Sequence, residues 1–126
     1  MEVTCSTAFD ERYDPKNVLS SNPKQFWITT GLYPHEMTFT FNQAKTINEV
    51  KFMSTGIRRV VISGCPTLNG NSFKDIGATK DLGGKDGHSL QKESIRIAQP
   101  ASFLMVKFTI VDGWDDFASV HSVEFS

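Results

Sequence analysis

The residues with the clearest chemical potential form an acidic group around a tryptophan near the C-terminus. Asp112, Asp115 and Asp116 surround Trp114 in a stretch that also contains Gly113. Three carboxylates in one short loop are hard oxygen ligands of the kind that bind Ca²⁺, although their spacing is not that of an EF-hand. Acidic residues between two strands are more often a solvated turn. We favour that interpretation and expect Trp114 to be exposed.

The other reactive side chains do not form a catalytic centre by their spacing. Cys5 and Cys65 lie in or at the end of alternating segments, which is typical of inert structural thiols. His35, His88 and His121 are far apart and share no zinc-ligand spacing. The sequence also lacks G-x-S-x-G, so no nucleophile and base can be paired. These observations favour a binding module over an enzyme.

Composition limits the architecture and the partners. The 126 residues predict one domain spanning 1–126, with a core to which ten phenylalanines contribute. A net charge of −1 gives no reason to expect a nucleic acid or an anionic membrane as partner. No apolar run has the length of a membrane span, and the N-terminal residues do not have the pattern of a signal peptide. We therefore expect a soluble, intracellular protein without membrane insertion.

Alternation of apolar and polar residues predicts an all-β fold. Strict period-two patterning over many short segments is typical of a β-sandwich or barrel. The predicted strands are 2–8, 35–42, 47–53, 57–64, 89–98, 102–111 and 117–125. A turn is expected at 54–56, and a single helical turn is expected to start at Pro15 with Asp14 as its N-cap.

The same alternation predicts which side chains face the core. In 102–111 the inward residues are Leu104, Val106, Phe108 and Ile110, and in 117–125 they are Phe117, His121, Val123 and Phe125. Trp27 is expected in the core. Arg58 and Arg59 are adjacent in a predicted strand, so they should point to opposite faces.

Four longer segments resemble known families. "PKNVLSSNPKQFWITTG" (15–31) is similar to the N-terminal signature of discoidin-like, galactose-binding-type jelly rolls. "NPKQFWITTGLYPHEMTFTF", "DLGGKDGHSLQKESI" and "FASVHSVEF" resemble the intraflagellar transport protein 25 family, also described as heat-shock-protein-beta-11-like, in the same order along the chain. The resemblance implies an antiparallel β-sandwich jelly roll with little helix.

The resemblance also implies a function. Members of this family act as non-catalytic subunits of the intraflagellar transport B complex, which moves cargo in cilia and flagella. They bind a Rab-like small GTPase, similar to intraflagellar transport protein 27. Location in the cilium or flagellum and in the cytoplasm is therefore expected.

Some relatives hold calcium between the loop before the tryptophan and the C-terminal strand. Where their pattern has Asp-Gly this chain has Ser20-Ser21, and Gln25 stands in place of a threonine. The remaining candidate oxygen donors are Asn17, Ser20, Asn22, Gln25, Thr30 and Glu124. Loss of the loop carboxylate removes a major anionic ligand, so we expect weak or no calcium binding and no other cofactor.

Candidate partner-binding residues come from one strand face and the neighbouring loops: Trp114, His121, Met105 and Lys107. An alternative function is a carbohydrate-binding module of the galactose-binding type. Its site would lie between the loops 81–89 and 112–116.

Overall fold

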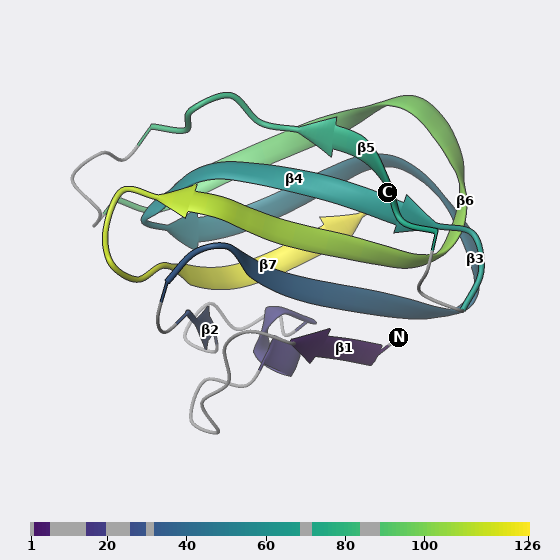
Figure 1. The fold of residues 1–126 in the computed structure, drawn as a ribbon, viewed down its shortest axis with the longest axis horizontal. Coiled ribbons are helices and arrows are strands. Elements are labelled where there is room, and N and C mark those ends of the chain that lie inside the picture. Colours follow the sequence, from purple (N-terminus) through teal and green to yellow (C-terminus); the bar gives the residue numbers. More distant parts are fainter. Residues whose placement is uncertain (1, 6–14, 20–25, 30–31, 69–71, 84–88) are drawn as a thin grey trace.

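The computed structural model describes residues 2–5, 15–19, 26–29, 32–68, 72–83 and 89–126, and it confirms an all-β fold (Figure 1). The elements are β1 (Glu2–Cys5), the 3₁₀ helix η2 (Pro15–Leu19), β2 (Trp27–Ile28), β3 (His35–Thr55), β4 (Ile57–Cys65), β5 (Lys74–Ala78), β6 (Gln91–Gly113) and β7 (Ser119–Phe125). Every strand pairing is antiparallel. The expected helical turn is present as η2, whereas its expected N-cap, Asp14, lies outside the described residues. β5 was not predicted from the sequence. Among the described residues, no helix has the length and apolar character needed to span a bilayer.

Two long strands build both layers of the sandwich. In one layer, the first half of β3 pairs with β1 and with the second half of β6; β6 pairs in turn with β4, and β4 with β5. In the other layer, the second half of β3 pairs with the first half of β6 and with β7, and β7 pairs with β2. Both long strands curve round at the same end of the molecule (Figure 1). The first set of strands is called sheet 1 below and the second set sheet 2.

β3 and β6 are each one continuous strand, so the prediction of two strands in place of each is wrong. Residues 42–46 and 98–102 are exposed runs that interrupt the alternation, and they suggested loops. In the structure they are the corner where both strands pass from one sheet to the other, with register shifts in the pairing. The Thr46 and Ser102 hydroxyls lie 2.9 Å apart there, which joins the two strands across the corner.

The core lies between the two sheets. Phe52 of sheet 2 meets Phe108 of sheet 1 edge-to-face, with ring centroids 5.1 Å apart. Such aromatic pairs add about 0.5–1.5 kcal/mol to the gain from burial. Trp27 has no exposed surface, which confirms its predicted place in the core. Val106, Phe108 and Ile110 are also fully buried, as the alternation in β6 predicts. Leu104, predicted to face inward with them, is only half-buried, and Phe103 is buried instead, so the alternation begins only after the corner.

The predicted inward face of β7 is wrong in two places. Phe117 precedes the strand and is 54% exposed, because the chain pairs with β3 only from Ser119 onward. At His121 the pairing with β3 shifts by one residue, so that Val120 and Val123 are both buried. An extra residue in one strand reverses the side-chain alternation beyond it. His121 therefore lies at a bulge, half-buried, instead of in the core.

Candidate functional site

Two glycines let the 112–116 loop lie close to the turn between β3 and β4. Gly56 has φ of 74°, a left-handed conformation that favours glycine, and its carbonyl accepts a hydrogen bond of 2.8 Å from the Trp114 backbone N–H. A Cβ on Gly113 would clash with the phenol oxygen of Tyr33. The loop is therefore fixed against the β3–β4 turn on one side and against Tyr33 on the other.

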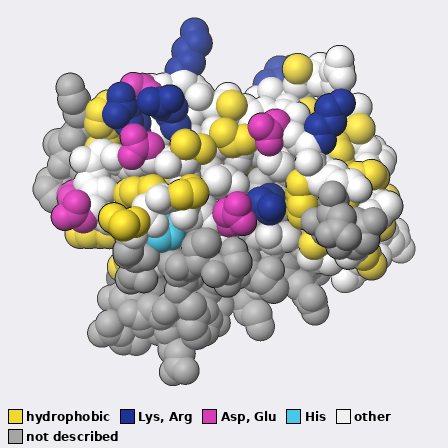
Figure 2. Space-filling view, viewed as in Figure 1, with side chains coloured by type: hydrophobic (Ala, Val, Ile, Leu, Met, Phe, Trp, Pro, Cys, Tyr) yellow, Lys and Arg dark blue, Asp and Glu magenta, His cyan; other side chains and the backbone are white. Residues whose placement is uncertain are grey.

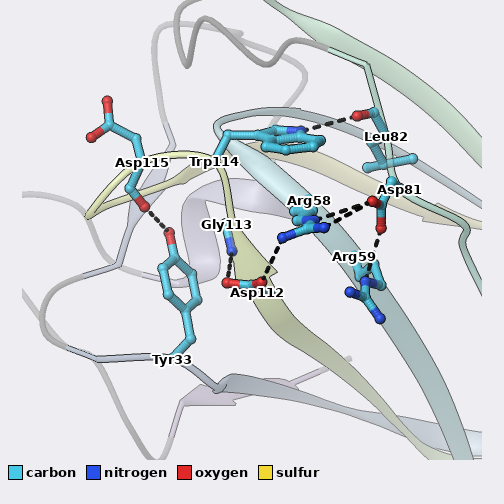
Figure 3. A network of polar contacts seen from close by, with 9 residues as sticks. All are labelled: Tyr33, Arg58, Arg59, Asp81, Leu82, Asp112, Gly113, Trp114 and Asp115. Carbon is cyan, nitrogen blue, oxygen red and sulfur yellow. Dashed lines mark hydrogen bonds and ion pairs between the residues drawn. The ribbon is translucent and has the colours of Figure 1, made fainter.

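Trp114 is half-buried and joins two loops, which corrects the expectation that it is exposed (Figure 3). Its indole N–H donates a 2.9 Å hydrogen bond to the Leu82 carbonyl. The guanidinium carbon of Arg58 lies 4.9 Å from the centre of the indole ring. The described part of the 81–89 loop and the 112–116 loop thus meet, as the carbohydrate alternative required. Trp114 occupies the junction, so its ring is not an open platform for a sugar.

Arg58 and Arg59 bind the same carboxylate, so the prediction that they point to opposite faces is wrong. Arg58 donates to Asp81 at 3.1 and 3.2 Å and lies 3.5 Å from Asp112, and Arg59 lies 2.9 Å from Asp81. The pairing of β4 with β6 shifts register on both sides of Arg59, which removes the regular alternation. The Arg58 hydrogen bond is the main reason why the pKa of Asp81 is lowered.

These charges gather at one end of the sandwich. Figure 2 shows acidic and basic side chains together there, with apolar side chains beside them, over the end of β6 and the start of β4. Surface ion pairs of this kind add little stability each, but a shared network fixes the positions of its members. The network therefore holds Trp114 and Asp112 in place.

A hollow of about 510 Å³ opens beside this network. Its lining consists of Leu32, Tyr33, Asp112, Gly113, Trp114, Asp115 and Asp116. The Tyr33 hydroxyl donates a 3.0 Å hydrogen bond to the Asp115 carbonyl. Burial raises the pKa of Tyr33, the nearby carboxylates raise it further, and a hydrogen bond with Thr29 acts in the opposite direction. Sequence reasoning singled out the three aspartates but not Leu32 or Tyr33, because no local pattern connects residues so distant in the chain.

The candidate calcium ligands are only partly described. Ser20, Asn22, Gln25 and Thr30 lie outside the described residues. The Asn17 side-chain amide donates a 3.0 Å hydrogen bond to the Phe26 carbonyl, and so ties η2 to the segment before Trp27. Glu124 is exposed on β7 opposite Lys51. Within the described part of the chain, no three His, Cys, Asp or Glu side chains are grouped to hold a metal ion.

The four candidate partner-binding residues do not form one surface. Met105 and Lys107 are half-buried on the outer face of sheet 1. The Lys107 ammonium lies 4.2 Å from the centre of the Phe73 ring and 3.8 Å from the Glu36 carboxylate. His121 belongs to sheet 2, where its ring is 4.8 Å from that of Phe26. Trp114 is in the loop network described above, about 20 Å along β6 from Lys107 at the usual rise per residue.

Comparison of the sequence with known proteins gives consistent relatives. The chain is 34% identical over 122 residues to the human protein named intraflagellar transport protein 25 homolog, with 97% of this chain and 83% of the human chain covered. The mouse protein of the same name has the same identity and coverage. Intraflagellar transport protein 25 of Chlamydomonas reinhardtii is 26% identical over 96% of this chain and 62% of its own length. No protein-family model matches the sequence.

Solved structures with a similar architecture include carbohydrate-binding modules. A CBM32 module from Clostridium perfringens, in complex with GalNAc-β-1,3-galactose, has a TM-score of 0.83 at 14% identity, over 98% of this chain and 93% of that chain. A chitosan-binding module from a Paenibacillus chitosanase/glucanase has a TM-score of 0.83 at 12% identity, over 99% and 93%. At these identities the similarity establishes the galactose-binding-like jelly roll and not a ligand.

Proposed function

The chain belongs to the intraflagellar transport protein 25 family, and from this we propose that it is a non-catalytic subunit of the intraflagellar transport B complex in cilia and flagella. The observation that carries the proposal is the 34% identity over 97% of the chain, because such a match covers the whole sandwich and not a single motif. Location in the cilium or flagellum and in the cytoplasm follows from the same proposal, as does a role in carrying cargo.

We further propose that the outer face of sheet 1 binds a Rab-like small GTPase similar to intraflagellar transport protein 27. Met105 lies between Thr40 of β3 and Cys65 of β4 in the sheet, which gives this face an apolar centre. Lys107 is already paired with Glu36, so covering it leaves no lone charge. Interface cores are enriched in methionine and aromatic residues and depleted in charged residues. Met105 and the Phe73 ring beside Lys107 supply the first two kinds, and the Lys107–Glu36 pair carries no net charge.

The direct test is co-purification of a tagged chain with a Rab-like GTPase from ciliated cells, scored for stoichiometric recovery. Met105→Glu should lower recovery about tenfold, the effect typical of losing one anchor residue. Met53→Glu is the matched control, because Met53 is equally half-buried but lies on the outer face of sheet 2. Equal recovery with both variants would contradict the proposed face, and absence of any GTPase with the unmodified chain would contradict the proposed partner.

Carbohydrate binding is the second candidate, and the hollow beside Tyr33 is the observation that favours it. Aromatic side chains and a few placed polar groups are the usual content of a sugar site. Both aromatic residues in this hollow are already engaged, since the Trp114 ring meets Arg58 and the Tyr33 hydroxyl binds Asp115. A glycan array with and without calcium distinguishes carbohydrate binding from the role of a transport subunit. A glycan that binds the unmodified chain but not Tyr33→Ala would favour the sugar site.

A further inference from the structure

Three exposed apolar residues lie in or directly beside the segments that form the hollow at the end of the sandwich. Leu32 lines the hollow and is 92% exposed. Val111 and Phe117, which flank the 112–116 loop on its two sides, are 40% and 54% exposed. Single exposed apolar residues are ordinary, but a group of them around a concavity is typical of an interaction site. We call Leu32, Val111, Phe117 and the residues that line the hollow the end surface.

The loop at the centre of the end surface is held by three hydrogen bonds. The 112–116 loop is fixed by the Trp114 backbone bond to Gly56, the indole bond to Leu82 and the Tyr33 bond to Asp115. A preorganised surface loses little conformational freedom when a partner binds, so more of the contact energy appears as affinity. Such rigidity distinguishes the end surface from an ordinary solvated turn.

Charge indicates the kind of partner. The Asp115 and Asp116 carboxylates have no ion pair with any described residue, whereas Asp112 shares Arg58 with Asp81. The apolar surface therefore has an acidic rim whose charge is only partly compensated. Interfaces are arranged so that opposite potentials meet, and like charges across an interface are costly. A partner that covers Leu32 must therefore place basic groups near Asp115 and Asp116.

We propose that the end surface docks a partner-protein segment in which a lysine or arginine lies next to a large apolar side chain. The apolar side chain would contact Leu32 and enter the hollow, and the basic side chain would pair with Asp115 and Asp116. Gly113, at the centre of this site, lies about 20 Å along β6 from Lys107. Val111, at its edge, is on the same face of β6 as Met105 and Lys107. Met105→Glu in the test below therefore distinguishes the two contacts.

The test is selection of 12-residue peptides on phage with the full chain as bait, in EDTA. Clones that also bind the triple variant Leu32→Ser, Asp115→Asn, Asp116→Asn are removed. Asparagine keeps a side-chain oxygen that can accept the Asp116 N–H, as the Asp115 carboxylate does now, so the loop retains its hydrogen bond. Thermal unfolding of the variant checks that it folds. The expected result is a consensus with Lys or Arg within two residues of Leu, Phe, Trp or Met.

Fluorescence anisotropy of one selected peptide then measures the dependence on each feature. Affinity should fall at least about tenfold in the double variant Asp115→Asn, Asp116→Asn, and it should weaken as salt increases. Leu68→Ser and Glu124→Gln are matched controls, because Leu68 is 63% exposed and Glu124 is an exposed carboxylate elsewhere. Both controls and Met105→Glu should leave peptide affinity unchanged, so the result is independent of the GTPase contact.

Three results would overturn the proposal. The first is a selection that yields no clone dependent on Leu32, Asp115 and Asp116, or only clones without basic residues. The second is the absence of any selected peptide together with calorimetric calcium binding that is lost in the double variant, which would make the loop a cation site. The third is self-association in sedimentation that Leu32→Ser abolishes, which would make the end surface a contact between two copies of this chain.

Discussion

Truncation of Trp114 tests the tertiary role of a residue that the sequence suggested was exposed. Trp114→Ala removes the indole that donates to the Leu82 carbonyl and contacts Arg58. The carbonyl of Leu82, a buried residue, would lose its donor, and the 112–116 loop would lose its attachment to the 81–83 segment. We therefore expect a clear loss of stability from a residue that sequence reasoning placed in solvent.

The magnitude follows from the burial and the bonds of the indole. Removing a fully buried Trp or Phe side chain costs about 3–5 kcal/mol. Since Trp114 is only half-buried, we take about half of that cost for lost packing and about 1 kcal/mol for the hydrogen bond. The expected loss is about 3 kcal/mol. Trp114→Phe keeps a ring for Arg58 but not the N–H, so it should cost only about 1 kcal/mol.

Urea unfolding followed by circular dichroism measures these differences, with Phe117→Ala as the control. Phe117 is a neighbouring aromatic residue that is 54% exposed, so its truncation should cost less than about 0.5 kcal/mol. The order Trp114→Ala, Trp114→Phe, Phe117→Ala is the signature of the described network. A loss below about 0.5 kcal/mol for Trp114→Ala, or a larger loss for Phe117→Ala, would refute the reasoning.

Four further expectations can be measured. Gly56→Ala should lower the free energy of unfolding by about 1–2 kcal/mol in chemical denaturation, because φ is positive and the new Cβ would lie 2.9 Å from the Phe117 carbonyl oxygen. Gly83→Ala is the control and should leave stability unchanged, because there is open space around Gly83. Gln91→Leu should cost about 3 kcal/mol, since the buried amide bonds three groups of Ser54 and Ile57 at the β3–β4 turn and the Gly83 carbonyl of the 81–89 loop, and its loss leaves them unsatisfied. The pKa of Tyr33 is raised by burial, so the folded state favours the neutral phenol. The stability gained from the neutral phenol is complete below the unfolded pKa of about 10 and is lost as the pH rises through the folded pKa. Ultraviolet titration of the unmodified chain and of Tyr33→Phe can follow this ionisation. Isothermal titration should show weak or no calcium binding, and micromolar affinity would contradict this expectation.

The sequence determined the class of fold because its information is local. Side chains alternate between the two faces of a strand, so the apolar positions of β3 and β6 and the burial of Trp27 could be read from spacing alone. Pro15 likewise marked the start of η2, because its fixed φ suits the first helical position. The family could also be recognised from segments such as "FASVHSVEF", since 34% identity extends along nearly the whole chain.

Only the tertiary structure decided where strands bend and which loops meet. A corner and a turn have the same polar composition, so 42–46 and 98–102 could not be distinguished from loops. The bulges at Arg59 and His121 reverse the alternation without any change in residue type. The end surface depends on contacts between residues distant in the sequence: Trp114 and Leu82 are 32 positions apart, and Tyr33 and Asp115 are 82 positions apart. Spacing along a chain carries no information on such contacts, because they form only when both sheets are in place.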